Sequence, residues 1–259
     1  MSRAPGLFAA SVPHTALVIA SACALLAFSV RADETPTASP PVECEEQEAQ
    51  PFLVRGNFVR RGRVSRDEAR ARSETHARAI RYRTEQYGHF APFGRPEWNA
   101  ATPASFAKTV RFFGLRVRLH EKILPAVKCA EREIVSACGA FPYTPRALSG
   151  LRDRNTYRGG EVSNHVYGIA LDIDPHLNTC CHCVAEWAEH PLCAREGTVF
   201  DRMAMPECWV RQFQRFGFYW LGDDALEDTM HFEFLGDPAH ILVADGPPAP
   251  LAPPVGAAE

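Results

Sequence analysis

Three side chains of this sequence have the types and the spacing of a catalytic metal site. His165 and Asp172 are seven residues apart, which suits a histidine in a loop and a carboxylate on the strand that follows, and Gly168 lets the backbone bend between them. His231 stands far downstream on a second predicted strand. Two imidazole nitrogens and one carboxylate oxygen leave the fourth position of a tetrahedral zinc ion open, as catalytic sites do. We therefore predict a hydrolytic Zn²⁺ centre, with buried structural histidines as the alternative.

Such a centre also needs a proton acceptor and a positive charge. Asp228 stands three residues before His231, next to Glu227, and is the candidate general base. Arg152, in the segment "SGLRDR", is the candidate cation that would stabilise a developing oxyanion or bind a substrate carboxylate.

The ligands are expected on two short strands with alternating faces. In "GIALDID" and in "TMHFEF", large apolar residues occupy every second position, so each strand has one apolar face and one face with possible ligands. The same faces carry Asp174 and Glu233. These two carboxylates either orient the ligand imidazoles or are simply exposed.

A dense cluster of cysteines follows the first of these strands. The segment "NTCCHCVAEWAEHPLC" holds Cys180, Cys181, Cys183 and Cys193. Removal of residues 1–32 as a signal peptide would take away Cys23 and leave eight of the nine cysteines, and an even number in an exported chain favours disulfides over thiolate metal ligands. We predict a disulfide scaffold beside the site, and a zinc knot that includes His182 is the alternative.

The rest of the chain predicts an exported protein with a helical region before the site. Residues 1–32 have the short basic start, apolar run and small-residue cleavage site of a signal peptide, and the apolar run is too short for a comfortable membrane span. Residues 33–50 are predicted to be a disordered linker, residues 51–128 a helical N-terminal region, residues 129–245 the domain with the site, and residues 246–259 a disordered Pro/Ala tail.

Three helical segments are expected. Ser65, with Glu68 three residues on, begins the first as a capping box, and its many arginines form either a basic surface or a solvated face with Glu–Arg pairs. Apolar spacing predicts helix from Thr102 to Cys138, interrupted near Pro125, and another helix from Pro206 to Gly217. The formal net charge of −3 gives no reason to expect a nucleic-acid partner.

The pattern "SNHVYGIALDID" followed by "DTMHFEF" resembles the zinc D-alanyl-D-alanine carboxypeptidase family, the VanY-like enzymes. Residues 130–236 carry the resemblance, including "SGLR" and the segment "CWVRQFQRFGFYWLGDD". It implies an α+β fold with a small central antiparallel sheet and flanking helices. It also implies Zn²⁺ held by His165, Asp172 and His231, Asp228 as base, Arg152 at the substrate and Ser163 as a hydrogen-bonding residue near it. Tyr167 either contacts the substrate or packs in the core.

Some residues depart from the family pattern. Aspartate replaces the usual glutamate at position 228, as it does in related L-alanyl-D-glutamate endopeptidases, and the short spacing between Arg152 and His165 leaves Arg154 or Arg158 as alternatives for the arginine role. The resemblance implies a zinc metallopeptidase that acts on peptidoglycan peptides, most simply as a D,D-carboxypeptidase. The predicted signal peptide places it in the periplasm or outside the cell, and we expect a monomer. An endopeptidase or a non-catalytic zinc-containing envelope-binding domain are the alternatives.

Overall fold

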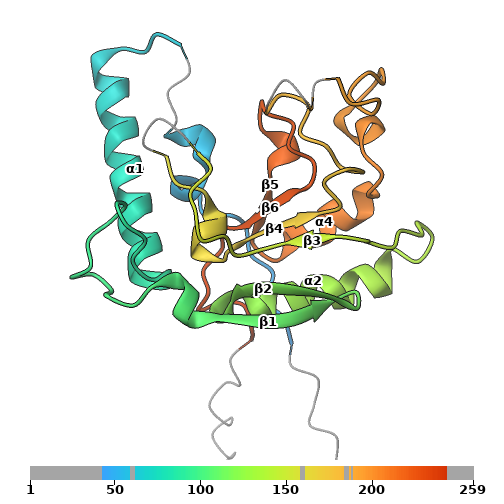
Figure 1. The fold of residues 1–259 in the computed structure, drawn as a ribbon, viewed down its shortest axis with the longest axis horizontal. Helices are drawn as coiled ribbons and strands as arrows, with labels where there is room; N and C mark the ends of the chain where they lie inside the picture. The colour runs from blue at the N-terminus through green and yellow to red at the C-terminus, as the bar shows by residue number, and fades with distance from the viewer. Residues whose placement is uncertain (1–42, 59–61, 158–160, 184–186, 188, 244–259) are drawn as a thin grey trace, which may run out of the picture. The chain divides into compact units, whose positions relative to one another are not determined.

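A four-stranded antiparallel sheet carries two of the three predicted ligands, Asp172 and His231, in a computed structural model of the chain (Figure 1). The strands β3 (Leu148–Ser149), β4 (Ala170–Ile173), β5 (Phe218–Trp220) and β6 (His231–Phe234) lie in the order β3-β4-β6-β5. Both strands predicted to carry ligands are confirmed, and they are direct neighbours in which Asp172 pairs with His231. The α+β character expected from the sequence is therefore present.

The structure describes residues 43–58, 62–157, 161–183, 187 and 189–243. The predicted signal peptide (1–32), most of the predicted linker and the Pro/Ala tail (246–259) lie outside these residues. Among the described residues, no helix combines the length and the apolar character that a membrane span requires. The described residues all belong to one compact unit.

The helix predicted from Thr102 to Cys138 is wrong in its first half. Strands β1 (Ala107–Phe112) and β2 (Leu115–His120) form a two-stranded hairpin there, and only α2 (Leu124–Ala137) is helical. The turn residues Phe113 and Gly114 both have positive φ, 44° and 81°, which is the geometry of a tight hairpin turn. In "LRVRLH" the apolar residues alternate with arginines, and this period of two is that of a strand and not of a helix.

The two other predicted helices are confirmed as α1 (Arg66–Tyr87) and α4 (Glu207–Arg215). The hydroxyl of Ser65 accepts a hydrogen bond from the amide of Glu68, 3.1 Å away, as the capping box predicts. Arginines of α1 pair with glutamates one turn away at three places. Of the two interpretations of its arginines, a solvated face with Glu–Arg pairs therefore describes the exposed side of this helix. Its C-terminal half is buried, through Ala79, Ile80, Arg83, Thr84 and Tyr87.

Short 3-10 turns connect these elements. They are η1 (Pro51–Leu53), η2 (Arg55–Asn57), η3 (Pro103–Phe106), η4 (Glu121–Ile123), η5 (Asn164–Tyr167), η6 (Val199–Arg202) and η7 (Leu221–Asp223). Aromatic side chains of β5, β6 and α4 fill the core beneath the sheet, with Phe213 stacked on Phe232 at 4.3 Å between ring centroids. This packing fixes the strand that carries His231.

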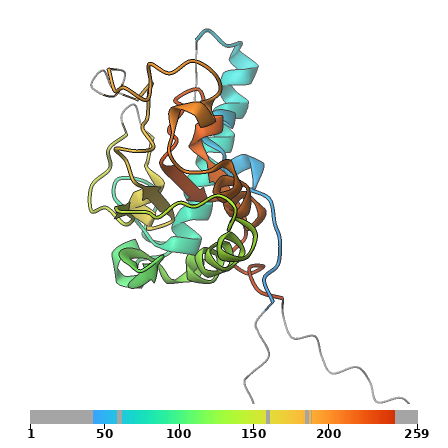
Figure 2. The ribbon, with the colours of Figure 1, turned by 90° about the vertical axis from the view of Figure 1, so that its right-hand side faces the viewer.

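Four disulfides join the eight cysteines from Cys44 onward: Cys44–Cys129, Cys138–Cys208, Cys180–Cys183 and Cys181–Cys193. The described part of the predicted disordered linker, residues 43–50, is instead extended and bonded to the body. Its Glu45 amide donates to the carbonyl of Ile241 at 2.9 Å, and Cys44 anchors it covalently. Figure 2 shows this segment, in blue, beside the red segment that ends at residue 243.

Candidate metal centre and active site

The three predicted ligands converge on one point of the sheet. Nε2 of His165 lies 3.1 Å from Oδ1 of Asp172 and 3.2 Å from Nδ1 of His231, and that Nδ1 lies 2.8 Å from the same Oδ1. Zinc–nitrogen bonds of about 2.0–2.1 Å in a tetrahedral site separate ligand atoms by about 3.3 Å, so these spacings suit one zinc ion. All three residues are buried.

Local structure explains how residues seven and fifty-nine positions apart meet. Asp172 and His231 are cross-strand partners on β4 and β6, so their side chains project from the same face. His165 sits in η5, which Ser163 caps at its N-terminus and Gly168 at its C-terminus, and the φ of 70° at Gly168 reverses the chain into β4. A Cβ at Gly168 would also lie 3.0 Å from the amide nitrogen of His120. The glycine is therefore required by both backbone angle and space.

Hydrogen bonds on the far side of each imidazole select the nitrogen that faces the ligand cluster. Nδ1 of His165 lies 2.6 Å from the carbonyl of Gly150, and Nε2 of His231 lies 3.0 Å from Oε1 of Glu233. Each of these nitrogens donates a proton to its oxygen partner, so the other nitrogen is the one that would present its lone pair to a metal ion. The donor set thus fits a metal ion in both composition and tautomer.

The electrostatics of the cluster favour a cation at its centre. Burial disfavours the protonated form of His231, but hydrogen bonds to Asp172 and Glu233 outweigh it and raise the pKa of His231 to about 10. Burial opposes ionisation of Asp172 as well, yet the two histidines hold its pKa well below the usual range. A divalent ion would supply the positive charge that these buried carboxylates attract.

Asp228 lies at the edge of the same cavity. This cavity, about 800 Å³ in volume, is lined by all three ligands together with Asp228, Arg152 and Ser163. Burial raises the pKa of Asp228 to about 6, and its Oδ1 has no hydrogen-bond partner among the described residues. A carboxylate with a raised pKa and a free oxygen is suited to proton transfer near neutral pH.

Of the three arginines considered, Arg152 is the one that the structure places at the cluster. Its Nη2 forms an ion pair with Oδ2 of Asp172, the carboxylate oxygen that faces away from the histidines. Arg154 is 91% exposed and pairs at 3.9 Å only with the equally exposed Asp153. Arg158 lies outside the described residues.

The remaining predicted positions divide between the cavity and the core. Ser163 is buried at the cavity, where its hydroxyl accepts a hydrogen bond from the His165 amide at 3.3 Å. Tyr167 is fully buried in the hydrophobic core, so core packing takes the place of the suggested substrate contact. With about three residues per turn in η5, Tyr167 points in a different direction from His165, two positions earlier.

The two additional carboxylates have different roles, and neither is exposed. Glu233 contacts His231, as described, whereas Asp174 accepts hydrogen bonds from the hydroxyl of Tyr143 and the amides of Arg146 and Ala147. Asp174 therefore fixes the backbone of residues 146 and 147, just before β3, and does not orient an imidazole.

The N-terminal region contributes cavity residues that the sequence did not indicate. Arg55, in η2, lines the cavity and forms a 2.6 Å ion pair with Glu161, and its guanidinium lies 5.0 Å from the ring of Tyr157, which also lines it. No motif marks Arg55, because it reaches the cavity only through the packing of η1 and η2 against the sheet and α1.

The cysteine cluster supports the candidate base directly. Cys180 forms a backbone bridge with Asp228, and the Thr229 amide donates to the carbonyl of Thr179 at 3.3 Å. Sγ of Cys183 lies 3.8 Å from Oδ2 of Asp228. Since Cys180 and Cys183 are joined as a disulfide, their sulfurs are not thiolate ligands, and the cluster is a scaffold beside the metal centre, as predicted.

One family comparison matches this part of the chain. Residues 157–234 match a family model described as D-alanyl-D-alanine carboxypeptidase. The matched span contains His165, Asp172, Asp228 and His231, and it is similar to a peptidase domain. Arg55 and Arg152 lie before it. No curated protein and no solved structure matches the chain.

Proposed function

We propose that this chain is an exported zinc metallopeptidase that hydrolyses peptidoglycan stem peptides, most simply as a D-alanyl-D-alanine carboxypeptidase. The observation that carries the proposal is the convergence of His165 Nε2, Asp172 Oδ1 and His231 Nδ1, with Asp228 and Arg152 on the same cavity. The match of residues 157–234 to the carboxypeptidase family model supports the reaction class.

Each polar side chain of the cavity has a task in such a reaction. A zinc ion held by His165, Asp172 and His231 supplies Lewis-acid chemistry for water and for the scissile carbonyl. Asp228 accepts a proton from the attacking water and returns it to the leaving amine. Because its pKa is raised to about 6, Asp228 is ionised at neutral pH and still close enough in pKa to act in both directions.

Arg152 provides the positive charge. Its planar guanidinium has five N–H donors, and only Nη2 is engaged with Asp172 among the described contacts. The remaining donors can bind a terminal carboxylate or the oxyanion that develops on the scissile carbonyl. A carboxypeptidase needs the first of these contacts, because its substrate ends in a carboxylate next to the scissile bond.

Export is part of the proposal and is supported by the four disulfides, which are typical of proteins in oxidising compartments. An L-alanyl-D-glutamate type endopeptidase is the second candidate. The observation that favours it is the aspartate at position 228, where the resembled carboxypeptidases have glutamate.

Digestion of purified muropeptides by the zinc-loaded protein, followed by mass analysis, tests the proposal. Loss of one terminal D-alanine is the expected result, and cleavage inside the stem would establish the endopeptidase instead. An Asp228→Ala variant that digests the peptides as fast as the original protein would rule out the mechanism. Zinc binding without any cleavage would leave a non-catalytic binding domain.

A further inference from the structure

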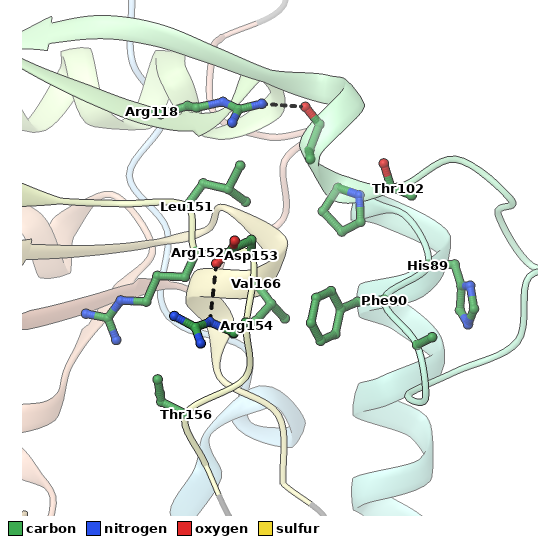
Figure 3. A pocket seen from close by; sticks show the side chains of 13 residues that line it. His89, Phe90, Thr102, Arg118, Leu151, Arg152, Asp153, Arg154, Thr156 and Val166 are labelled. Carbon is green, nitrogen blue, oxygen red and sulfur yellow. Dashed lines mark hydrogen bonds and ion pairs between the residues drawn. The ribbon is translucent and has the colours of Figure 1, made fainter.

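A second cavity adjoins the catalytic one across the loop of residues 151–156 (Figure 3). Its volume is about 880 Å³. Arg152 and Thr156 line both cavities, so the two cavities border the same loop. In Figure 3 the side chain of Arg152 points away from Phe90, whereas Val166 lies between the loop and Phe90. A peptide in the catalytic cavity that extends past Arg152 and Thr156 would reach the second one.

The lining of this second cavity combines an apolar floor with a positive rim. Phe90, Leu151 and Val166 contribute apolar surface, and Arg118 and Arg154 join Arg152 as charged residues. Asp153 is the one carboxylate among the described lining residues, and its side chain is 96% exposed. The cavity thus has three arginines against one aspartate, which favours an anionic occupant with some apolar surface.

Hydrogen bonds hold the walls in place without a ligand. The Leu151 amide donates to the carbonyl of Arg118 at 2.7 Å, and the Arg118 guanidinium donates to the carbonyl of Ala104 at 3.0 Å. On the opposite wall, the amide of His89 donates to the carbonyl of Ala101 at 2.8 Å. The hairpin, the 151–156 loop and the segment after α1 are therefore joined to one another, and the cavity is preformed.

The second cavity is built mostly from parts of the chain outside the family match. Arg118 comes from β2 and Phe90 from the segment after α1, both well before residue 157, whereas Val166 lies within the matched span. The cavity is thus an addition that the N-terminal region makes to the peptidase-like domain.

We infer that this second cavity is a substrate subsite for an acidic peptide segment, in which Arg118 and Arg154 each offer a guanidinium group to side-chain carboxylates remote from the scissile bond. The inference rests on the proposed function, because the occupant is the continuation of the peptide in the catalytic cavity. Guanidinium groups bind carboxylates through paired hydrogen bonds, while the apolar floor contacts the aliphatic part of the same residue.

The test compares two peptides that end in D-alanyl-D-alanine, one with free side-chain carboxylates and one in which these are amidated. In the zinc-loaded protein, the double change Arg118→Gln and Arg154→Gln should raise KM for the acidic peptide by about 5- to 25-fold, since an exposed charge pair is worth up to a factor of about five. Neither kcat nor the KM of the amidated peptide should change.

Arg116→Gln is the matched control, because Arg116 is two residues from Arg118 on the same strand and does not line the cavity. The single variant Arg154→Gln keeps the test valid if the double variant does not fold, because a change in a side chain that is 91% exposed does not disturb the fold. Equal KM values for the two peptides in the original protein, or a KM for the acidic peptide that the double variant leaves unchanged, would overturn the subsite.

Equilibrium binding of the same peptides separates this inference from the proposed function. If the protein cleaves neither peptide but binds the acidic one more tightly, and loses that preference in the double variant, the subsite stands and the peptidase proposal fails. If it cleaves both peptides with no preference in binding, the peptidase stands and the subsite fails.

Discussion

The carboxylate of Glu233 accepts a hydrogen bond from Nε2 of His231 at 3.0 Å, and both side chains are buried on the same face of β6. The two residues are two positions apart on one strand, so the pleat itself brings them together. This contact fixes the ring orientation and leaves Nδ1 to face His165 and Asp172. Such partners of a ligand imidazole commonly tune metal affinity.

We expect Glu233→Gln to weaken zinc binding by about 10- to 100-fold, because the negative charge that supports the imidazole is lost. Competition with a chromophoric chelator measures this affinity. Glu207→Gln, which removes an exposed partner of Arg211 on α4, is the control and should bind zinc normally. An unchanged affinity in Glu233→Gln would show that this hydrogen bond only supports folding.

Removal of zinc should abolish hydrolysis and lower thermal stability. An ion present at about 1,000 times its Kd stabilises the folded state by about 4 kcal/mol, which corresponds to a fall in Tm of roughly 8–16 °C for a chain of this size. Calorimetry before and after chelation measures the shift. Zinc should restore both properties and Mg²⁺ should restore neither, because two of the three ligands are imidazoles.

The pH dependence of hydrolysis should report Asp228. Burial raises its pKa to about 6, and a base acts only when it is deprotonated, so kcat/KM should rise with pH through about 6 and then level off. Asp228→Asn should lower kcat by about 10²- to 10⁴-fold and remove this limb of the profile while zinc content stays normal. If the rise of kcat/KM through about pH 6 persists in Asp228→Asn, the titrating group is a residue other than Asp228.

Arg152→Ala should lower kcat/KM for an N-acylated D-alanyl-D-alanine by about 10²- to 10³-fold, because a charged donor at the reacting group is lost. Arg152→Lys should recover part of this loss, as it keeps the charge but not the planar fork. The substrate has no side-chain carboxylate, so Arg154→Ala should hydrolyse it normally. Loss of activity in Arg154→Ala instead would move the arginine role to that residue.

The disulfide beside the base should affect catalysis more than metal binding. Replacing Cys180 and Cys183 with serine loosens the segment that forms a backbone bridge with Asp228, and we expect kcat to fall about tenfold with zinc content unchanged. The control replaces Cys138 and Cys208, which join α2 to α4 and do not line the cavity, and it should lower Tm while kcat is kept.

The metal cluster could be predicted because its residues follow local rules. His165, Gly168 and Asp172 are close in sequence, and the alternation in "TMHFEF" places His231 on a strand with one apolar face. Pairing of two short strands was then enough to bring the ligands together. The disulfide scaffold followed from the even number of cysteines and not from their order, which is why the pairing itself could not be predicted.

Other parts depend on contacts that are distant in sequence. The β1–β2 hairpin was mistaken for helix because its apolar residues also fall near helical spacing, and the deciding feature was the positive φ of Phe113 beside Gly114. The sequence around Arg55 contains no motif that indicates a role at the cavity. Its position depends on an ion pair with Glu161, which is more than a hundred residues away in the sequence. Tyr167 was uncertain because the direction of a side chain in a 3-10 turn requires the turn to be known.

The segments at residues 43 and 243 run antiparallel and touch, with the amide of Val243 donating to the carbonyl of Glu43 at 3.0 Å. A short linker could therefore join these two positions, and new ends could be opened in an exposed loop, without disturbing the sheet that carries the ligands. A force that pulls these two positions apart would break the Val243–Glu43 hydrogen bond, and residue 44 would then still be held by the covalent bond between Cys44 and Cys129. The disulfide thus ties the segment at residue 44 to α2 even when the hydrogen bonds between the two segments are broken.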